Sequence, residues 1–313
     1  MEGRGGYHAA NEGIKSARPA IGVPRRPLPS RLRGLRSRPT LPMNAASTDD
    51  PIEEAWLRAA AGLATAEVLA EAASTMDRAR QIAADQNSRL PAVVIAGRQT
   101  AGRGRRGAAW WQPPGSLVVS LVVDGAVVGG GVKPTWSLAC GVALAETIRE
   151  LEPAVEARVR WPNDVEVAGR KLAGILVESV AAGRVVFGVG VNTSGRGGDA
   201  PEPLRQRVVT LPDITGRIMP RQRLLAALVP RLLELLGRLA VEPRALSRRY
   251  RPLCSLTGST VRVFVGDTIH AGICRGIADG GGLIVEADGE RTVVRSGSLT
   301  PPGDEWRGDD SGA

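Results

Sequence analysis

The sequence predicts a chain of helices and strands that ends in a small all-β barrel. Segments with apolar residues three or four positions apart alternate with short apolar runs, and the short runs predict buried strands. After Leu253 the pattern changes to short strands separated by glycine turns, which predicts a compact β unit of about fifty residues. A length of 313 residues with 43% hydrophobic content allows two domains, or one large domain with an appendage, and a substantial core.

The net charge of +9 lies mostly at the beginning of the chain. Residues 1–42 contain nine lysines and arginines and two glutamates, a net charge of +7, so the rest of the chain carries +2. This segment is rich in proline, arginine and glycine and cannot bury enough apolar surface to fold, so residues 1–50 are predicted to be a disordered basic tail. Met43 directly follows the basic segment and is an alternative start of translation. A nucleic-acid-binding arm is the functional alternative for the same residues.

Cysteine usage and hydropathy indicate the compartment. Cys140, Cys254 and Cys274 are odd in number and far apart, which favours a reducing cytoplasm and argues against a disulfide framework or a cysteine metal site. The longest apolar stretch, 117–132, is interrupted by Asp124 and by glycines, so no membrane span is expected. The first forty residues also lack the apolar segment of a secretory signal.

The first elements are predicted between residues 51 and 87. Alanine-rich residues 51–86 favour helix by propensity. Ser74 and Thr75 are a cap signal for a helix over 76–87. Residues 66–72 could instead be a strand that enters this cap, although their propensity favours helix.

The remaining elements follow from hydrophobic spacing and from glycine turns. Helices are predicted over 135–151, 221–239 and 243–250. Strands are predicted over 93–96, 117–123, 184–191, 260–265, 268–276, 282–286 and 291–294. A β-hairpin with a tight glycine turn is predicted at 165–180, and Pro230 should kink its helix. Residues 193–218 predict a long irregular loop, and loops of that length are usually functional or disordered.

A basic, glycine-rich loop at 98–107 follows the strand predicted at 93–96. Its glycines allow the backbone to approach a ligand closely: Gly102, Gly104 and Gly107. Its arginines suit carboxylate and phosphate oxygens: Arg103, Arg105 and Arg106. The loop is therefore predicted to bind an anion.

The glycine spacing in this loop also matches the G-x-G-x-x-G dinucleotide fingerprint. That fingerprint requires a helix to begin at the third glycine. The chain instead continues into Pro113, Pro114 and Gly115, which prevent a continuing helix, so a nicotinamide or flavin site is not expected. A solvated basic loop without a ligand is the other alternative.

A second informative segment covers residues 158–178. Lys171 lies just after the turn of the predicted hairpin, and Gly174 leaves its strand without a side chain where a ligand can approach. Asn163 and Asp164 place an amide and a carboxylate at the start of the partner strand. A solvated lysine and a simple turn cap are the alternatives.

Together the two segments supply what carboxylate adenylation requires. A carboxylate and the α-phosphate of ATP are both anionic and repel each other. Guanidinium, ammonium and metal groups must hold them in line until pyrophosphate leaves. Because Mg²⁺ prefers oxygen ligands and keeps several waters, Asn163 and Asp164 suffice as its candidate ligands.

The motifs GRGRRG, RWPND and RKLAGILVE, followed by GVGVN and a small β unit, make residues 65–300 resemble the biotin protein ligases. The resemblance implies an α+β catalytic domain over 51–253, with a mixed β-sheet of the type of class II aminoacyl-tRNA synthetases and biotin and lipoate ligases. It implies a small Src-homology-like β-barrel over 254–300 and a mobile tail over 301–313. It also makes residues 66–72 a strand, against their propensity.

The same resemblance implies a two-step reaction. Biotin and ATP with Mg²⁺ give biotinyl-5'-AMP and pyrophosphate. A lysine of a biotin carboxyl carrier protein, or carrier domain of a biotin-dependent carboxylase, then attacks the mixed anhydride. The expected protein is a cytoplasmic monomer or homodimer.

Matching positions within these motifs assign residues to the two ligands. The residues expected at biotin are Ser74, Thr75, Met76, Gln99, Gly102, Arg103, Gly104, Arg105, Lys171 and Gly174. The residues expected at ATP or the adenylate are Arg103, Arg105, Arg106, Trp110, Asn163, Asp164, Lys171 and Asn192, with Mg²⁺ at Asn163 and Asp164. The expected catalytic residues are Lys171, Arg105 and Asp164, with Lys171 as the cation at the carboxylate and α-phosphate.

Two features differ from many members of the family. Met76 stands where many have asparagine, so a side-chain amide contact is missing there. No recognisable helix-turn-helix precedes the catalytic segment, so no specific DNA binding is expected.

Two other functions compete with biotin ligation. A lipoate or other acyl-acid ligase could use the same scaffold, and the acid that supports pyrophosphate exchange would distinguish it. The basic composition suggests a nucleic-acid-binding protein. If removal of residues 1–42 abolished DNA affinity, that affinity would come from the charge of the tail alone.

Overall fold

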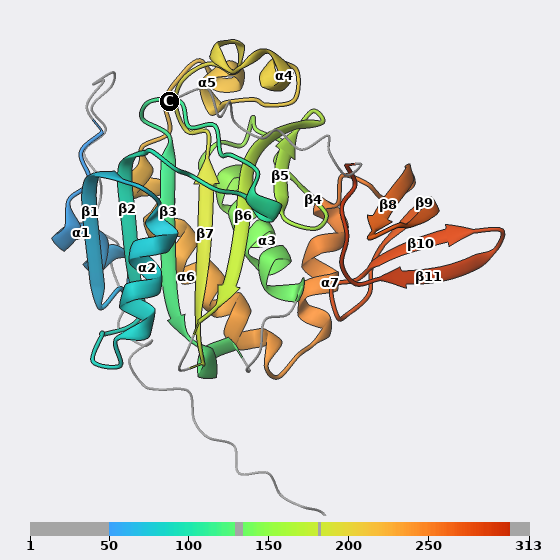
Figure 1. Cartoon of the computed structure of the whole chain (residues 1–313), viewed down its shortest axis with the longest axis horizontal. Coiled ribbons are helices and arrows are strands. Elements are labelled where there is room, and N and C mark those ends of the chain that lie inside the picture. Colours follow the sequence, from blue (N-terminus) through green and yellow to red (C-terminus); the bar gives the residue numbers. More distant parts are fainter. Residues whose placement is uncertain (1–49, 129–133, 181–182, 301–313) are drawn as a thin grey trace, which may run out of the picture. The chain divides into compact units, whose positions relative to one another are not determined.

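A computed structural model of the chain describes residues 50–128, 134–180 and 183–300 (Figure 1). The predicted tails, apart from residue 50, and the alternative start Met43 lie outside these residues. None of the described helices is long and apolar enough to cross a membrane.

Seven strands form one mixed sheet, in the order β1-β2-β3-β7-β6-β5-β4. Their bounds are β1 Thr65–Ala72, β2 Ala92–Gln99, β3 Leu117–Asp124, β4 Arg158–Arg160, β5 Asp164–Val167, β6 Arg170–Ser179 and β7 Arg184–Val191. The β1–β2 pair is parallel and the other neighbouring pairs are antiparallel. The mixed sheet implied by the resemblance is therefore confirmed.

Helices cover both faces of this sheet (Figure 1). They are α1 Glu54–Ala61, α2 Thr75–Ala84, α3 Pro134–Leu151, α6 Arg221–Leu239 and α7 Arg244–Tyr250. On β2, Val93 and Ile95 belong to the large core that includes α3 and α6, whereas Ala92 and Val94 belong to the smaller core under α2. A strand buried on both faces needs apolar residues at successive positions, which explains why this segment reads as a continuous apolar run.

Residues 65–72 form a strand, as the resemblance implied, and the propensity-based prediction of helix is wrong there. The alanine-rich helix α1 ends at Ala61 because Gly62 adopts a left-handed conformation with φ of 68°. Register pairs from Thr65–Ala92 to Ala72–Gln99 then align β1 with β2. Pairing with a buried neighbour outweighs the intrinsic preference of alanine for helix.

The helix α2 is fixed at both ends by side chains. At its start, the Ser74 hydroxyl accepts a hydrogen bond from the Met76 amide at 3.3 Å, as the cap signal predicted. At its end, the Arg184 guanidinium of β7 donates to the carbonyls of Ile82 at 3.2 Å, Asp85, and Gln86 at 3.1 Å. These contacts satisfy carbonyls that the helix itself leaves unpaired.

Replacing Arg184 by methionine is therefore expected to destabilise the fold by about 1–3 kcal/mol, since several charge-assisted hydrogen bonds are lost. Chemical denaturation measures the change. Arg98→Met is the matched control, because among the described residues Arg98 pairs only with the exposed Glu71, at 2.9 Å, and its loss should cost less than about 0.5 kcal/mol. Equal destabilisation by the two substitutions would contradict the capping role.

The long segment after β7 is more regular than the predicted irregular loop. It contains a 3-10 turn at Gly197–Asp199 and two short helices, α4 Glu202–Arg205 and α5 Leu211–Thr215. A capping box starts α5: the Thr210 hydroxyl accepts from the Asp213 amide at 3.2 Å, and the Asp213 carboxylate accepts from the Thr210 amide at 2.9 Å. Threonine followed three positions later by aspartate was the available sequence signal.

Four antiparallel strands form the C-terminal sheet, in the order β11-β10-β9-β8. They are β8 Thr260–Val265, β9 Thr268–Ile277, β10 Leu283–Ala287 and β11 Glu290–Val294. The predicted all-β unit is confirmed, but the described strands form an open sheet rather than a closed barrel. A single bridge between Phe264 and Ser298 joins the free side of β8 to the chain that follows β11. The Trp161 indole N–H donates to the Gly281 carbonyl at 3.1 Å and connects this sheet to the main one.

Candidate active site

A cavity of about 460 Å³ lies on the face of the main sheet that carries α2. It brings together most of the predicted residues from separate parts of the chain. The predicted residues that line it are Ser74, Thr75, Met76, Gln99, Arg103, Gly104, Arg105, Arg106, Trp110, Asn163, Asp164, Lys171, Gly174 and Asn192. Gly102 is the exception: it does not line the cavity, and its carbonyl accepts from the Trp110 amide at 3.0 Å.

Bare glycine backbone forms part of the cavity floor. Gly174 of β6 and Gly190 of β7 are register partners. A methyl group on Gly190 would lie 2.5 Å from the Trp110 ring, and one on Gly188 would lie 2.7 Å from the Met76 sulfur. The Trp110 ring and the Met76 side chain therefore occupy the space that a side chain at position 190 or 188 would need. Glycines alternating along an otherwise apolar strand were the sequence signal for Gly188 and Gly190, which the predicted site had not included.

A buried polar network holds one end of the cavity. The Gln99 side-chain oxygen accepts hydrogen bonds from the amide and the hydroxyl of Thr75, at 2.8 Å and 3.1 Å. The Ser120 hydroxyl of β3 donates to the Thr75 hydroxyl at 2.8 Å. Because each group is already oriented by a partner, the helix start and Gln99 form a rigid wall. Ser120 was not predicted.

The segment 102–110, called here the lid loop, folds back on itself beside the cavity. Arg103 and Ala109 form an antiparallel bridge, and the Gly104 amide donates to the Ala108 carbonyl at 2.7 Å. Of the three predicted glycines, Gly107 adopts a left-handed conformation (φ 77°), and so does Arg106 (φ 57°). No α-helix begins at Gly107, so this loop lacks the arrangement of a dinucleotide site.

Arg105 points into the cavity from the lid loop. Its guanidinium donates to the Asn163 side-chain oxygen and to the Gly297 carbonyl, both at 3.2 Å. Burial lowers the pKa of Arg105, the neighbouring charge of Arg106 lowers it further, and Asp164 opposes both. An arginine keeps its charge despite such a shift, so the cavity retains a fixed, poorly hydrated cation.

Lys171 and Asp164 form the central ion pair of the cavity. The Lys171 ammonium lies 2.8 Å from the Asp164 Oδ1 and 5.7 Å from the centroid of the Trp110 ring. The backbone of Lys171 also pairs with the long segment after β7, donating to the Arg207 carbonyl at 2.8 Å. Three elements thus fix where the ammonium lies, and the predicted grouping of Lys171 with Asp164 is observed.

Further residues that were not predicted also line the cavity, some within the segment 158–178 and others after β7 or near residue 300. They are chiefly Arg160, Glu166, Leu204, Gln206, Arg207, Ser298 and Thr300. With these, six cationic side chains and two carboxylates line the cavity, which makes it strongly positive. A positive cavity with low-dielectric walls concentrates anions.

Asn192 holds the segment after β7 against the sheet. Its side-chain amide donates to the Val209 carbonyl at 3.0 Å. Its side-chain oxygen is buried and has no hydrogen-bond partner among the described residues. A buried acceptor at the cavity edge is suited to a donor group of a ligand.

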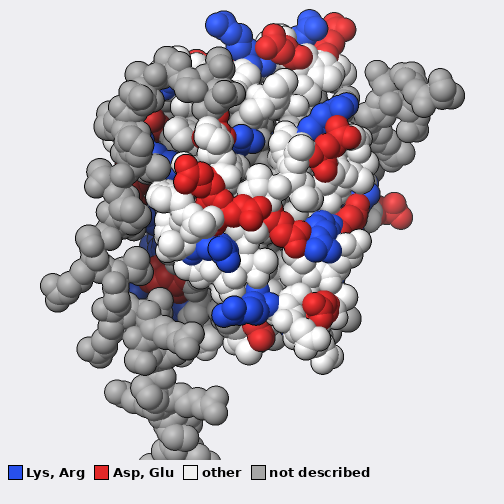
Figure 2. All heavy atoms as spheres, turned by 90° about the vertical axis from the view of Figure 1, so that its left-hand side faces the viewer, with Lys and Arg blue, Asp and Glu red and all other residues white. Residues whose placement is uncertain are grey.

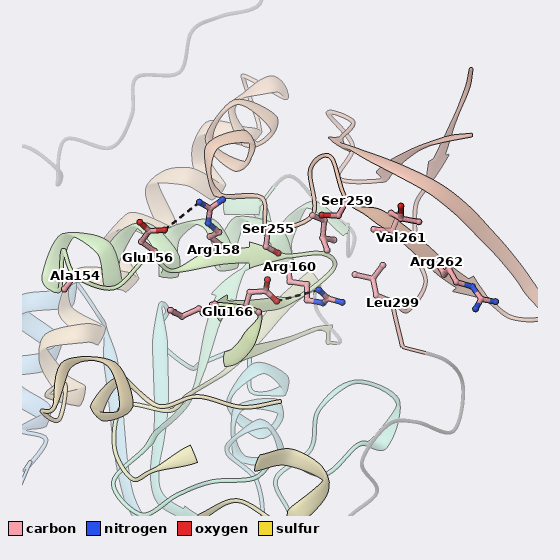
Figure 3. A pocket seen from close by; sticks show the side chains of 15 residues that line it. Ala154, Glu156, Arg158, Arg160, Glu166, Ser255, Ser259, Val261, Arg262 and Leu299 are labelled. Carbon is pink, nitrogen blue, oxygen red and sulfur yellow. Dashed lines mark ion pairs between the residues drawn. The ribbon is translucent and has the colours of Figure 1, made fainter. Parts of the chain in front are cut away.

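A second cavity, of about 980 Å³, lies between β4, β5 and β8 (Figure 3). It shares Arg160, Glu166 and Gly169 with the first but contains none of the predicted residues. Four of its five charged side chains already face one another: Glu156 lies 3.8 Å from Arg158, and Glu166 lies 3.7 Å from Arg160. The smaller cavity is therefore the candidate active site.

The candidate Mg²⁺ ligands are both engaged by cations. Asn163 accepts from Arg105, and Asp164 pairs with Lys171. The described part of the chain contains no cluster of three or more histidine, cysteine, aspartate or glutamate side chains that could hold a metal ion.

Comparison with known proteins agrees with this geometry. Residues 71–194 match the biotin/lipoate A/B protein ligase family. The biotin--[acetyl-CoA-carboxylase] ligase of Mycobacterium tuberculosis is 35% identical over 265 residues, which are 80% of this chain and 95% of that protein. The bifunctional ligase/repressor BirA of Escherichia coli is also 35% identical, over 204 residues, and the match spans 62% of its length.

A solved structure of the biotin protein ligase from Aquifex aeolicus, in complex with biotin and ATP, is similar in fold. The TM-score is 0.66 at 25% sequence identity, and the match covers 75% of this chain and 97% of that one. The chain therefore belongs to the biotin protein ligase family.

Proposed function

We propose that the protein activates biotin with ATP as biotinyl-5'-AMP and transfers the biotinyl group to a lysine of a biotin carboxyl carrier protein. The observation that carries this proposal is the convergence of Lys171 and Arg105 in one cavity with a rigid, partly apolar end. Two anions can be brought together there, because fixed cations offset their repulsion. The Aquifex relative, solved with biotin and ATP, supports the same pair of substrates.

Biotin is assigned to the end of the cavity formed by the start of α2. The Thr75–Gln99 network supplies polar groups for the ureido ring, and Met76 over Gly188 supplies an apolar contact for the rest of the molecule. Gly104 and Gly174 leave room for the carboxylate beside Lys171. Met76 thus gives a thioether contact where an asparagine amide is common in the family.

Lys171 and Arg105 are assigned to the reacting groups. The biotin carboxylate attacks the α-phosphorus of ATP, the bond to the bridging oxygen breaks, and pyrophosphate leaves. Both cations stabilise the charge that develops on the α-phosphate oxygens. Before ATP and Mg²⁺ bind, Asp164 keeps the ammonium in place through their 2.8 Å ion pair.

ATP is assigned to the side formed by Trp110, Asn192 and the segment after β7, with Arg106 on the lid loop. Mg²⁺ bound with ATP would offset phosphate charge. Asn163 and Asp164 would hold it through one amide oxygen and one carboxylate, with ATP and water completing its coordination. This fits only if substrate binding frees the two side chains from their present cationic partners.

In the second step, the carrier lysine attacks the carbonyl carbon of the mixed anhydride. The new amide forms as the bond to the AMP oxygen breaks, and AMP leaves. The carrier domain would approach the open side of the cavity, close to the C-terminal segment that contributes Ser298 and Thr300. We retain 51–253 as the catalytic domain and 254–300 as the C-terminal domain, with a monomer or homodimer as the working unit.

A nucleic-acid-binding function is less well supported. On the face shown in Figure 2, acidic and basic side chains are interspersed. Among the described residues, ion pairs such as Arg78–Glu67 at 2.8 Å and Arg98–Glu71 at 2.9 Å pair part of the basic charge. Binding of a nucleic-acid backbone usually needs an extended surface of unpaired positive charge.

The proposal is tested with an apo carrier domain, ATP and either biotin or lipoate. We expect ATP-dependent amide formation with biotin, at a rate at least about a hundredfold above that with lipoate, because a site built to pair polar groups rejects an acid that leaves them unpaired. Mass spectrometry of the carrier measures the product. Faster transfer of lipoate would favour the alternative acyl-acid ligase.

A further inference from the structure

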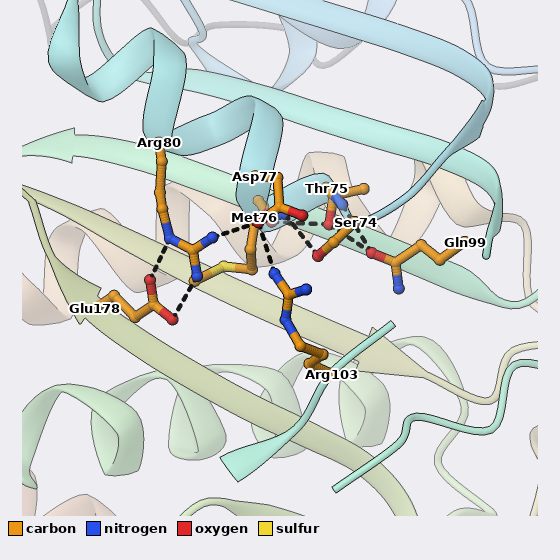
Figure 4. A network of polar contacts seen from close by, with 9 residues as sticks. Ser74, Thr75, Met76, Asp77, Arg80, Gln99, Arg103 and Glu178 are labelled. Atoms are coloured by element: carbon orange, nitrogen blue, oxygen red, sulfur yellow. Dashed lines mark hydrogen bonds and ion pairs between the residues drawn. The ribbon is translucent and has the colours of Figure 1, made fainter. Parts of the chain in front are cut away.

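The side chain of Arg103 does not point to the Lys171–Asp164 pair. It crosses from the lid loop to the first turn of α2, where its Nη2 lies 2.6 Å from the Asp77 Oδ1 (Figure 4). Asp77 is not a lining residue of the cavity. The sequence motif alone placed Arg103 at the ligand, whereas the structure pairs its guanidinium with a carboxylate beside the ligand site.

Asp77 is itself held in place. Arg80, one turn further along α2, also contacts its carboxylate. Arg80 in turn makes two hydrogen bonds to Glu178 of β6, Nε to Oε2 at 2.7 Å and Nη2 to Oε1 at 2.9 Å. The carboxylate that receives Arg103 is therefore anchored to the sheet through two further charged side chains, as Figure 4 shows.

The Arg103–Asp77 contact lies beside the end of the cavity that is assigned to biotin. Asp77 directly follows Met76, which lines the end of the cavity assigned to biotin, and Arg103 lines the same cavity from the lid loop. The Arg103–Asp77 contact thus joins the two walls of that end. Opening the loop requires this ion pair to separate.

We propose that Asp77 is a positioning residue that clasps the lid loop shut through Arg103 and so retains the acyl-adenylate between the two half-reactions. This inference rests on the proposed function. A mixed anhydride that escapes before the carrier protein arrives is lost, so slow release favours transfer. The clasp acts through the lid backbone and leaves Lys171 and Arg105 to contact the reacting groups.

The expected effect is moderate, because both partners are partly exposed: 44% for the Arg103 side chain and 38% for that of Asp77. Asp77→Asn should accelerate adenylate release by about two- to tenfold, as expected for a partly exposed pair within a charge network. Added salt should accelerate release from the wild type and have less effect on Asp77→Asn. Asp77→Glu restores the charge and should recover part of the retention.

The experiment loads the full chain with labelled biotin and ATP, without carrier, and follows release of the labelled adenylate after dilution. Glu71→Gln is the matched control, since it removes the partner of Arg98 near the end of β2, and neither residue lines the cavity. We expect faster release from Asp77→Asn and unchanged release from Glu71→Gln. Equal release from Asp77→Asn and the wild type, or equal acceleration by the control, would overturn the clasp.

A second readout does not depend on the reaction. Amide hydrogen exchange over residues 102–107 in the ligand-free protein should be faster in Asp77→Asn than in the wild type, and unchanged exchange there would overturn the clasp. If the wild type formed no adenylate, the proposed function would fail, and this exchange measurement would still decide whether the clasp exists.

Discussion

Replacement of Lys171 by alanine is expected to slow adenylate formation by about 10²–10³-fold while the fold survives. The ammonium lies in the candidate active site, 2.8 Å from Asp164 and beside the Trp110 ring. In the proposed reaction it offsets both the repulsion between the carboxylate and α-phosphate and the charge that develops as pyrophosphate leaves. The substitution also leaves the Asp164 carboxylate uncompensated, which adds further negative charge where the substrates must bind.

Pyrophosphate release in a single turnover, with biotin and ATP and without carrier, measures this effect. Arg170→Ala is the matched control. Arg170 is the neighbouring cation at the start of β6, and its side chain does not line the cavity. Lys171→Arg keeps the charge but changes its geometry and should fall between the two. A rate for Lys171→Ala within about threefold of the wild type would show that the ammonium has no part in the chemistry.

Gly190→Ala is expected to have the second largest effect, a loss of about tenfold or more in adenylate formation. Its methyl group would lie 2.5 Å from two carbons of the Trp110 ring, and Trp110 already lies over Gly174 on the neighbouring strand. The indole would have to move, and the Lys171 ammonium next to it would lose its packing surface. Displacements of about 1 Å near reacting groups are enough for losses of this size.

Gly198→Ala is the control for this substitution, because a methyl group there has no atom within 4 Å. Both variants are compared by single-turnover kinetics and by thermal unfolding. We expect Gly190→Ala to lose activity without a matching loss of stability, and Gly198→Ala to retain activity. Full activity of Gly190→Ala would mean that the observed position of the Trp110 ring is not needed for the reaction.

Much of the fold could be predicted from local patterns, because most elements have strong ones. The apolar runs of β2, β3 and β7 and the four short strands of the C-terminal sheet follow their sequence signals closely. The alanine-rich strand β1 could not be predicted from propensity, because its pairing with β2 is a long-range contact. Local patterns also could not predict whether the C-terminal sheet closes into a barrel. Closure depends on the path of the chain after β11, which pairs with β8 only through the Phe264–Ser298 bridge.

Residues of the candidate site could be predicted where they belong to recognised motifs. The Lys171–Asp164 pair and the Thr75–Gln99 contact join residues that motif matching had selected. The partner of Arg103 was not predictable, since an arginine in an anion-binding loop can turn either to the ligand or to a nearby carboxylate such as Asp77. Arg207 was missed because single arginines outside a recognised motif are usually solvated. Arg160 was missed although it is the first residue of the RWPND motif, because only Asn163 and Asp164 were selected from that motif.

The central claim is that one cavity holds an acid and a nucleotide together and activates the acid. The most direct test is a single-turnover reaction of the full chain with biotin and α-labelled ATP in the absence of any carrier protein. We predict a burst of biotinyl-5'-AMP that approaches one molecule per chain, stays bound to the protein and requires biotin. Release of labelled AMP at the same rate with and without biotin, and no bound intermediate, would contradict the account.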